Sequence, residues 1–407
     1  MMVNVIGLGY IGLPTALMMA THGIEVVGTD CNQDVVSSLL QGKTTFKEDG
    51  IDELYQEALK AGIKFTTEYQ AADIYVVSVP TPYDKFSKKI DPSYVVRAVR
   101  EVLRAAREGA VIVIESTVSP GTIDAYVRPE IEAAGFVAGK DIQLAHAPER
   151  IIPGNMVYEL IHNNRTIGVD DKSCGEKVKA IYASFCQGEI FVTDIKTAEM
   201  TKVVENTFRA VNIAFANELA KICRHSNMDV YEIIKICNQH PRVNILQPGP
   251  GVGGHCIPVD PWFLVGDYPS LTRLIGAALH VNEDMPEYVL NRIYEIMQER
   301  GMTDITRVGL YGLTYKENVD DIRESPTLQI LESQKRHLAA GLKVYDPYVS
   351  EDVVDNQYHS LDDFLADVDF VVIMVQHREI VENVEKLVGK VILDCRNVFH
   401  SEGIYHL

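Results

Sequence analysis

The fold is decided by "VNVIGLGYIG", residues 3–12, a short apolar run that ends in three glycines. "LPTALMMATHG", residues 13–23, follows with the composition of a helix, and a second apolar run, "EVVGTD", ends at Asp30. Strand, glycines, helix, strand and acid in this order form the fingerprint of a dinucleotide-binding βαβ unit. The alternative is a βαβ unit of the same pattern that binds no cofactor.

The spacing of the glycines predicts how a dinucleotide would bind. Gly7, Gly9 and Gly12 let a pyrophosphate approach the N-terminus of the following helix. Asp30, 18 residues after Gly12, can accept hydrogen bonds from both ribose hydroxyls. Because a carboxylate at this position repels a 2′-phosphate, the sequence favours NAD over NADP.

Three later strands end in polar, turn-forming residues: "DIYVVSVPTP", "GAVIVIESTVSPG" and "DIQLAHAPERIIPG". In an open parallel sheet, ligands bind beyond the carboxyl ends of the strands. We therefore expect one cleft beside the cofactor, lined by Thr81, Ser116, Thr117, Glu149 and Arg150. Taken singly, each of these residues is also typical of an ordinary turn or cap.

After about residue 195 the pattern changes to helix. "TAEMTKVVENTFRAVNIAFANELAKICRHS", residues 197–226, has almost no helix breaker and has apolar residues at helical spacing. Lys202, Asn206 and Arg209 share one stripe of this helix, although a solvated polar face would give the same spacing. Helices are also predicted within 229–239 and 270–300, and the apolar surface of this all-helical region predicts a dimer interface.

The last hundred residues return to an α/β pattern. "TRVGLYGLTYK", "LKVYDP", "DFVVIMV" and "KVILDC" predict strands, and "ESPTLQILESQKRHLAAG", residues 324–341, predicts a helix. This region is expected to form a second Rossmann-like domain that binds something other than NAD, because it lacks GxGxxG. Lys316, Arg323 and Arg396 lie at or beyond strand ends, where they could meet phosphates, with scattered surface cations as the alternative.

One segment, "GPGVGGHCIPVDPWF" at residues 249–263, surrounds a single thiol with four glycines. Glycines let the main chain approach a ligand closely and expose its N–H groups. Cys256, with such donors nearby and Asp260 four residues later, therefore resembles a reactive thiol. A buried structural cysteine at the end of a loop is the alternative.

Bulk properties narrow the class of protein. A chain of 407 residues, 46% hydrophobic and 23% charged, predicts two or three soluble domains. The net charge of −19 argues against a nucleic-acid binder. Seven cysteines without a CxxC pair indicate reduced thiols of a cytoplasmic protein. Because no apolar run is long enough to span a membrane and a strand begins next to Met1, neither a membrane span nor a signal peptide is expected.

Taken together, these motifs resemble a known family. "VIGLGYIGLP", "VPTP", "EST", "PER", "AEMTKVVENTFRAVNIAFANEL", "HPRVNILQPGPGVGGHCIPVDPWF" and "GLTYKENVDDIRESP" follow one another in the order found in the UDP-glucose/GDP-mannose dehydrogenases. The resemblance covers essentially the whole chain. It implies an enzyme that oxidises the 6-hydroxymethyl group of a nucleotide sugar to a carboxylate in two hydride transfers to NAD.

The resemblance also implies a substrate. "HPRVNILQPGPGVGGHC" is most similar to family members that oxidise UDP-N-acetyl-D-mannosamine for surface polysaccharides. UDP-N-acetylglucosamine and UDP-glucose are the alternative substrates.

Roles for individual residues follow from the same resemblance. Cys256 is the expected nucleophile, which forms a thiohemiacetal and then a thioester, with Lys202 and Asn206 stabilising the oxyanion. Asp260 and Glu149 would order or activate water, in roles that the sequence does not separate. The expected cofactor contacts are Gly7, Gly9, Tyr10, Ile11, Gly12, Asp30, Thr81, Thr117 and Arg323. The expected nucleotide-sugar contacts are Arg150, Ile151, Lys202, Asn206, Arg209, His240, Arg242, Gly253, Tyr315, Lys316 and Arg396.

Two of these contacts carry a further expectation. Arg242 is expected to come from the partner subunit of a homodimer, which would make dimerisation necessary for activity. Close relatives often have lysine where this chain has Arg396, a change that keeps the charge but alters the contact geometry.

The predicted architecture is two Rossmann-like doubly wound domains joined by a central all-helical dimerisation region. The boundaries are an NAD-binding domain at 1–195, a helical domain with the cysteine at 196–300 and a UDP-sugar-binding domain at 301–407. Two rival classes remain: a zinc site formed by His240, His255 and Cys256, whose adjacent ligands would strain one tetrahedral centre, and an NAD-binding scaffold or two-electron dehydrogenase without thiol chemistry. We expect no metal.

Overall fold

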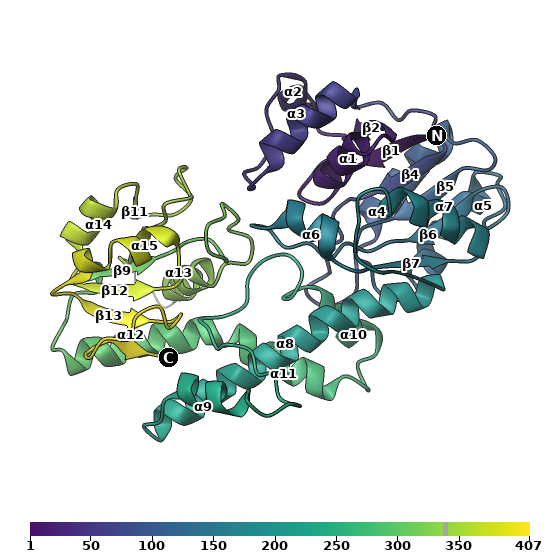
Figure 1. The fold of residues 1–407 in the computed structure, drawn as a ribbon. Coiled ribbons are helices and arrows are strands. Elements are labelled where there is room, and N and C mark those ends of the chain that lie inside the picture. Colours follow the sequence, from purple (N-terminus) through teal and green to yellow (C-terminus); the bar gives the residue numbers. More distant parts are fainter. Residues whose placement is uncertain (337–340) are drawn as a thin grey trace. The chain divides into compact units, whose positions relative to one another are not determined.

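The computed structural model describes residues 1–336 and 341–407 (Figure 1). The chain divides into two compact units. Unit 1 consists of Met1–Glu205 with Trp262–Asp267, and unit 2 consists of Asn206–Pro261 with Tyr268–Leu407. The boundary between Glu205 and Asn206 falls inside the long helix α8 (Ile195–His225).

Unit 1 is built on an eight-stranded sheet with the order β3-β2-β1-β4-β5-β6-β7-β8. The chain first adds β2 and β3 on one side of β1 and then crosses over to add β4 on the other side, as in a Rossmann fold. Its strands are β1 (Met2–Ile6), β2 (Glu25–Thr29), β3 (Lys64–Thr66), β4 (Ile74–Val77), β5 (Val111–Ile114), β6 (Gln143–His146), β7 (Arg165–Val169) and β8 (Ile190–Thr193).

The pairing of β6 with β7 departs from the expected parallel sheet, because these two strands are antiparallel. The other paired strands of this sheet are parallel. The chain between β6 and β7 contains only one short helix, α6 (Met156–His162). An antiparallel strand added to a parallel sheet in this way is common in doubly wound folds.

Helices cover both faces of this sheet. α1 (Gly12–Thr21), α3 (Ile51–Ala61) and α7 (Lys172–Tyr182) share one apolar core with the strands, and α4 (Ser93–Ala105) and α5 (Arg128–Ala133) share the other. The strands are apolar on both sides, as expected for a sheet that is buried on both faces. The remaining elements of unit 1 are α2 (Gln33–Leu40) and the π-helical turn η1 (Ile123–Val127).

Unit 2 contains a six-stranded parallel sheet with the order β11-β10-β9-β12-β13-β14, so it repeats the order of the first six strands of unit 1. This confirms the second Rossmann-like fold. Helices α12 and α13 pack on one face, and α14 and α15 pack on the other. The strands are β9 (Val308–Tyr311), β10 (Lys343–Tyr345), β11 (Gln357–Tyr358), β12 (Phe370–Ile373), β13 (Val391–Asp394) and β14 (Tyr405–His406), with helices α13 (Pro326–Arg336), α14 (Leu361–Asp367) and α15 (Arg378–Glu382) and turns η2 (Ile305–Arg307) and η3 (Val384–Leu387).

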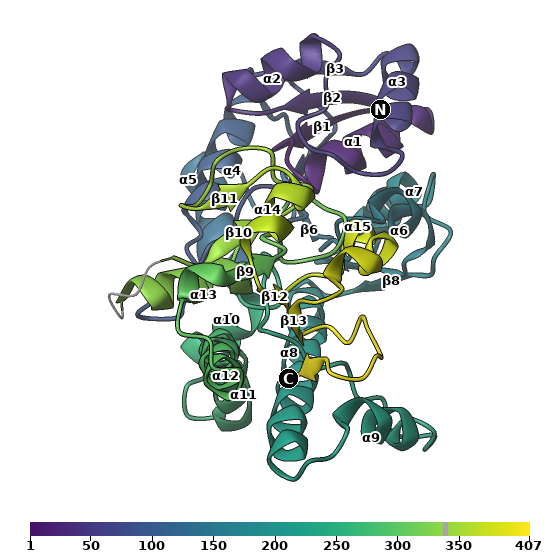
Figure 2. The same cartoon turned by 90° about the vertical axis from the view of Figure 1, so that its left-hand side faces the viewer.

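The helical part of the chain that follows β8 and precedes β9 in the sequence contains α8, α9 (Val230–Cys237), α10 (Asp260–Asp267), α11 (Arg273–Glu283) and α12 (Met285–Glu299). α8 is visible as the longest helix in Figure 2. The helical stretch predicted at 270–300 is divided at Asp284, because Pro286 can only occupy the first turn of a new helix. α10 was not predicted. Of the helix predicted up to residue 341, residues 337–340 lie outside the described residues.

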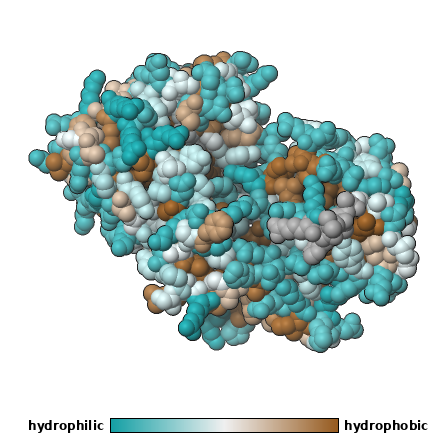
Figure 3. Space-filling model, turned by 180° about the vertical axis from the view of Figure 1, so that it is seen from behind, coloured by the Kyte–Doolittle hydropathy of each residue, from teal (hydrophilic) through white to brown (hydrophobic). Residues whose placement is uncertain are grey.

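Hydrophilic residues cover most of the face of the molecule shown in Figure 3. On the face shown in Figure 3, hydrophobic residues form small separate patches among hydrophilic ones. In the described parts of the chain, none of the helices has the length and apolar character needed to span a membrane.

Candidate active site

The glycine motif forms a cradle at the carboxyl end of β1. A Cβ atom on Gly7 would lie 2.3 Å from the carbonyl oxygen of Ser78, and one on Gly12 would lie 1.9 Å from the carbonyl oxygen of Gly7. Around Gly9, in contrast, no atom lies within 4 Å of such a Cβ. Gly7 and Gly12 are therefore required by close packing of the backbone, and Gly9 leaves open space at the start of α1, where a pyrophosphate would fit.

Asp30 lies at the end of β2 beside this cradle. Its carboxylate accepts hydrogen bonds from the backbone N–H groups of Leu8 and Asn32, both at 2.8 Å. These bonds fix the carboxylate next to the glycine motif, in the position that a ribose-binding acid occupies. Tyr10 stacks on Phe46 with the ring centroids 4.4 Å apart, and Ile11 precedes the first residue of α1.

The residues after β4 and β5 are linked to each other. Ser116 accepts a hydrogen bond from the N–H of Val79 at 2.8 Å and donates to its carbonyl oxygen at 2.7 Å. Thr81 is buried and Thr117 is half-buried in these adjoining loops. The structure thus places both predicted cofactor threonines at the same sheet edge as the glycine cradle.

Glu149 is part of a buried ion pair that the sequence did not reveal. Its carboxylate accepts from Arg165 Nη2 at 2.5 Å, and both side chains are only 4% exposed. Its other oxygen accepts from the N–H of Arg150 at 2.7 Å. The Arg165 guanidinium also lies 4.5 Å from the centre of the Tyr182 ring. Both oxygens of Glu149 are therefore committed to neighbouring groups of the same unit.

A second buried acid, Glu115, lies in this cluster. It accepts from the hydroxyls of Thr15 at 3.3 Å and Tyr182 at 3.1 Å. Burial, together with the charge of Glu149, raises the pKa of Glu115 to about 8. The cluster joins residues of α1, β7 and α7 with Glu115, which follows β5. Glu115, Arg165 and Tyr182 were not predicted as site residues from the sequence. The signal available for Glu115 and Arg165 was a charged residue beside or within an apolar strand.

Arg150, Ile151 and Lys202 are the remaining predicted site residues of unit 1. The Arg150 guanidinium forms a bidentate ion pair with Glu205 (2.6 and 2.9 Å) and also donates to Asn164 and Thr166. Ile151 and Lys202 are buried. Lys202 lies one turn before Asn206 on α8, and both are buried, whereas Arg209 is exposed.

The cysteine loop, which we define as residues 249–256, belongs to unit 2. Gly254 has a φ of +86° and its N–H donates to the carbonyl oxygen of Arg323 at 2.8 Å. A Cβ on Gly253 would lie 2.5 Å from the Cβ of Tyr315. The loop thus packs directly against the segment that carries Tyr315 and Lys316, and the thiol of Cys256 at its end is exposed.

Asn206 and Asp260 meet next to this loop. Asn206 Nδ2 donates to Asp260 Oδ2 at 2.6 Å, and both side chains are buried. Asp260 begins α10, and its N–H donates to the carbonyl oxygen of Cys256 at 2.8 Å. One predicted oxyanion donor and one predicted acid are therefore connected to the residue that carries the thiol.

The predicted cations of unit 2 differ in their surroundings. Arg323 is exposed and forms an ion pair with the buried Asp321 at 2.6 Å. Arg396 Nη1 lies 2.9 Å from the position of a Cβ on Gly249, so its guanidinium adjoins the start of the cysteine loop. Arg209, His240 and Arg242 are exposed.

In the described part of the chain, no cluster of three or more His, Cys, Asp or Glu side chains could hold a metal ion. His255, half-buried next to Cys256, has its pKa lowered by burial and by the charge of Arg323.

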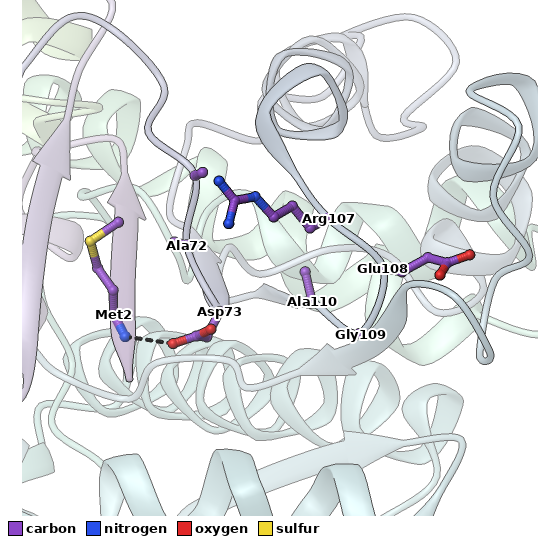
Figure 4. Close-up of a pocket in the computed structure, with 8 residues that line it drawn as sticks. Met2, Ala72, Asp73, Arg107, Glu108, Gly109 and Ala110 are labelled. Carbon is purple, nitrogen blue, oxygen red and sulfur yellow. Dashed lines mark hydrogen bonds between the residues drawn. The ribbon is translucent and has the colours of Figure 1, made fainter.

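One surface pocket lies at the opposite edge of the unit 1 sheet (Figure 4). It is lined by residues near the amino ends of β1, β4 and β5, including Met2, Asp73 and Arg107. The N–H of Met2 donates to Asp73 at 2.8 Å. Because it is not at the carboxyl ends of the strands, this pocket is separate from the glycine cradle.

The fold and the cradle define the class: a dinucleotide-binding α/β protein with a second Rossmann-like unit. Comparison with family models agrees, because three models of one family match in succession. They are the NAD-binding domain at residues 1–186, the central domain at 196–284 and the UDP-binding domain at 309–401. The chain belongs to the UDP-glucose/GDP-mannose dehydrogenase family, and it is an NAD-dependent nucleotide-sugar dehydrogenase.

Several individual proteins of this family are similar to the chain over nearly its whole length. The chain is 40% identical to a UDP-N-acetyl-D-mannosamine dehydrogenase of Methanococcus vannielii, over 97% of this chain and 92% of the relative. It is 38% identical to an NDP-N-acetyl-D-galactosaminuronic acid dehydrogenase of Ralstonia nicotianae, over 99% and 97%. The solved UDP-D-ManNAc dehydrogenase of Pyrococcus horikoshii superposes with a TM-score of 0.92 at 36% identity, covering 100% of this chain and 98% of that one.

Proposed function

We propose that this enzyme oxidises UDP-N-acetyl-D-mannosamine to UDP-N-acetyl-D-mannosaminuronate, through a covalent intermediate on Cys256. The observation that carries the proposal is the cysteine loop, which joins an exposed thiol to the segment of Tyr315 and Lys316 and, through Asp260, to Asn206. When bound, NAD accepts one hydride from the sugar carbon in each of two oxidations. The cradle of Gly7, Gly9 and Gly12 with Asp30 fits this dinucleotide.

The residues of the chain account for the remaining chemistry. After the first oxidation, the thiolate of Cys256 adds to the aldehyde carbon and the oxygen takes up a proton, which gives a thiohemiacetal. Its oxidation leaves a thioester, and water hydrolyses this to the carboxylate and the free thiol. Lys202 and Asn206 stabilise the negative oxygen at each tetrahedral stage. Tyr315, Lys316, Gly253 and Arg396 bind the nucleotide sugar.

The surroundings of the two acids favour different roles. Glu149 is held in a buried ion pair with Arg165, whereas Asp260 is tied to Asn206 and to the main chain of Cys256. We therefore assign the ordering and activation of the hydrolytic water to Asp260, and a structural role within unit 1 to Glu149.

The covalent mechanism is tested by the yield of NADH. With limiting UDP-N-acetyl-D-mannosamine and excess NAD, the native protein should release two NADH per sugar. Cys256→Ala should bind both ligands but release at most one NADH per sugar, with turnover lowered by on the order of 10⁴. Cys237→Ala, which removes another exposed thiol, is the matched control and should behave like the native protein. Two NADH per sugar at the native rate from Cys256→Ala would end the covalent mechanism.

The identity of the sugar is tested separately. Relatives at 38–40% identity carry names that refer to different N-acetylated sugars. NADH formation should be measured with UDP-N-acetyl-D-mannosamine, UDP-N-acetylglucosamine, UDP-N-acetylgalactosamine, UDP-glucose and GDP-mannose. We expect the highest kcat/KM with the first, and a higher value with any other sugar would replace it.

We also propose that the protein is a cytoplasmic homodimer in surface-polysaccharide biosynthesis, with the three domains at 1–195, 196–300 and 301–407. Phe208, Phe215 and Ile222 on α8 are 64%, 50% and 56% exposed, and their seven-residue spacing places them in one apolar stripe. A second α8 would cover such a stripe.

The same dimer would let Arg242 act in the partner's site. Mixing inactive Arg242→Ala chains with inactive Cys256→Ala chains should then restore activity, because one site of each heterodimer is complete. No recovery after verified subunit exchange would place Arg242 outside the partner's site.

A further inference from the structure

Helix α8 carries a buried asparagine, Asn217, that the proposed chemistry does not use. It is fully buried, at 0% exposure, in the interior of a helix. Asparagine is unfavourable in helix interiors, and a buried amide must find hydrogen-bond partners to offset its desolvation. The partners of Asn217 therefore indicate why the residue lies there.

Those partners form a chain of three hydrogen bonds, each 2.9 Å long. The N–H of Gly249 donates to Asn217 Oδ1, Asn217 Nδ2 donates to Asn282 Oδ1, and Asn282 Nδ2 donates to the carbonyl oxygen of Ala210. This series of hydrogen bonds allows only one orientation of the Asn217 and Asn282 side-chain amides, because the backbone N–H at one end can only donate and the carbonyl oxygen at the other end can only accept. Asn282, on α11, is only 5% exposed.

Gly249 is the first residue of the cysteine loop, and the other end of that loop is held by the same helix. There Asn206 binds Asp260, whose N–H binds the carbonyl oxygen of Cys256. Asn206 and Asn217 are three turns apart on α8, which places them on one face at an axial separation of about 16 Å. A single rigid element therefore anchors both flanks of the loop.

Between these anchors the loop has little resistance to bending. Gly249, Gly251, Gly253 and Gly254 contribute backbone freedom, and holding each of them in one conformation costs entropy. Contacts with Tyr315 and Arg323 hold the middle of the loop. If the bond at Gly249 is lost, the loop keeps its middle and far contacts but its start is released.

We infer that Asn217, oriented by Asn282, is a positioning residue that fixes the start of the cysteine loop and thereby the location of the Cys256 thiol. The consequence for turnover rests on the proposed function of Cys256, but the location of the thiol can be measured without any substrate. The hydrogen bonds of the Asn217 side chain go to Gly249 and Asn282.

The test compares Asn217→Ala, Asn282→Ala and the double variant with the native protein. The rate of Cys256 alkylation by iodoacetamide is measured on the Cys256 peptide by mass spectrometry, with Cys237 of the same molecules as the internal reference. We expect the Cys256 rate to change several-fold in Asn217→Ala, less in Asn282→Ala, and no further in the double variant, because the two amides act in series. The Cys237 rate should not change.

Asn212→Ala is the matched control. Asn212 also lies on α8 and bonds to the segment before the loop, at Asn244 and Leu246, but not to Gly249. In Asn212→Ala, the rate of Cys256 alkylation should equal that in the native protein. An unchanged rate in Asn217→Ala, or an equal change in Asn212→Ala, would overturn the inference. If Asn217→Ala does not fold, Asn282→Ala decides, and a native Cys256 rate there overturns the inference.

Kinetics give the second readout. A displacement of about 1 Å at a reacting atom can lower turnover by on the order of 100-fold. Asn217→Ala should therefore lower kcat by about 10- to 100-fold, leave the Kd for NAD unchanged, and release fewer than two NADH per sugar because aldehyde escapes before the thiol adds. A changed alkylation rate with a native NADH yield would retain the positioning role and contradict the covalent function, so the two failures are distinguishable.

Discussion

The structural role proposed for Glu149 can be tested by substituting Arg165, its partner in the buried ion pair. Arg165→Met keeps a similar length of side chain but leaves the Glu149 carboxylate buried and without its counter-charge, since both side chains are 4% exposed. Removing one partner of a buried pair costs about 3–5 kcal/mol. The change also removes the cation–π contact with Tyr182, whose ring centre lies 4.5 Å away. We therefore expect the free energy of unfolding to fall by about 3–5 kcal/mol.

The double variant Arg165→Met/Glu149→Gln supplies the contrast. It removes the unpaired charge as well, so most of the lost stability should return. Urea unfolding can be followed by the fluorescence of Trp262, the single tryptophan, which is buried and belongs to the same compact unit as the pair. Equal destabilisation in the single and double variants would refute the reasoning.

Activity measurements on the same double variant test whether Glu149 also takes part in catalysis. If Glu149 only supports the fold, the double variant should still release two NADH per sugar, whereas Asp260→Asn should accumulate the thioester on Cys256. Loss of the second oxidation or of hydrolysis in a stable double variant would return Glu149 to the catalytic residues.

The remaining predictions concern the cofactor cradle and the pH dependence of stability. Asp30→Ala should weaken NAD binding and reduce discrimination against NADP, measured by titration calorimetry, and unchanged affinity for both dinucleotides would contradict the assigned role. Gly9→Ala should leave the unfolding transition unchanged but weaken NAD binding, whereas Gly12→Ala should also destabilise unit 1, because its Cβ would lie 1.9 Å from the carbonyl oxygen of Gly7. Burial raises the pKa of Glu199 from the ordinary 4.5 to about 7, so the folded state holds a proton that the unfolded state releases, and this contribution to stability is lost as the pH rises from about 4.5 to 7. Glu199→Gln should therefore gain stability relative to the native protein across that window, by about 3 kcal/mol at most, and a difference independent of pH in urea unfolding would contradict the raised pKa.

Local pattern was sufficient for much of the fold. The strands at β1, β2, β9 and β12 follow from short apolar runs that end in turn residues, and the glycines after β1 follow from the dinucleotide fingerprint. Such signals lie within a few residues of the structure that they determine. Features that depend on distant residues were not predicted. The antiparallel pairing of β7 with β6 and the short helix α10 depend on the chain that surrounds them.

In the site, too, features set by neighbouring residues could be predicted from the sequence, and features set by distant residues could not. Cys256 and its glycines form a contiguous motif, so their association could be predicted from the sequence. The difference between Glu149 and Asp260 could not, because it depends on Arg165, a residue in another strand, and on Asn206, in another helix. In the sequence each acid is only a carboxylate near a turn. Asn217 likewise appears as one polar residue in an apolar helix, and its role follows only from the folded position of Gly249.

Helix α8 gives the proposed oxyanion site a fixed internal geometry. Lys202 is among the last unit 1 residues of this helix, and Asn206 is the first residue of unit 2. One helical turn of α8 separates them, a rise of about 6 Å along the helix axis. Asn206 in turn holds Asp260, and Asp260 holds the carbonyl oxygen of Cys256. The thiol, the acid and Asn206 are thus connected within unit 2, and Lys202 precedes Asn206 by one turn of the same helix.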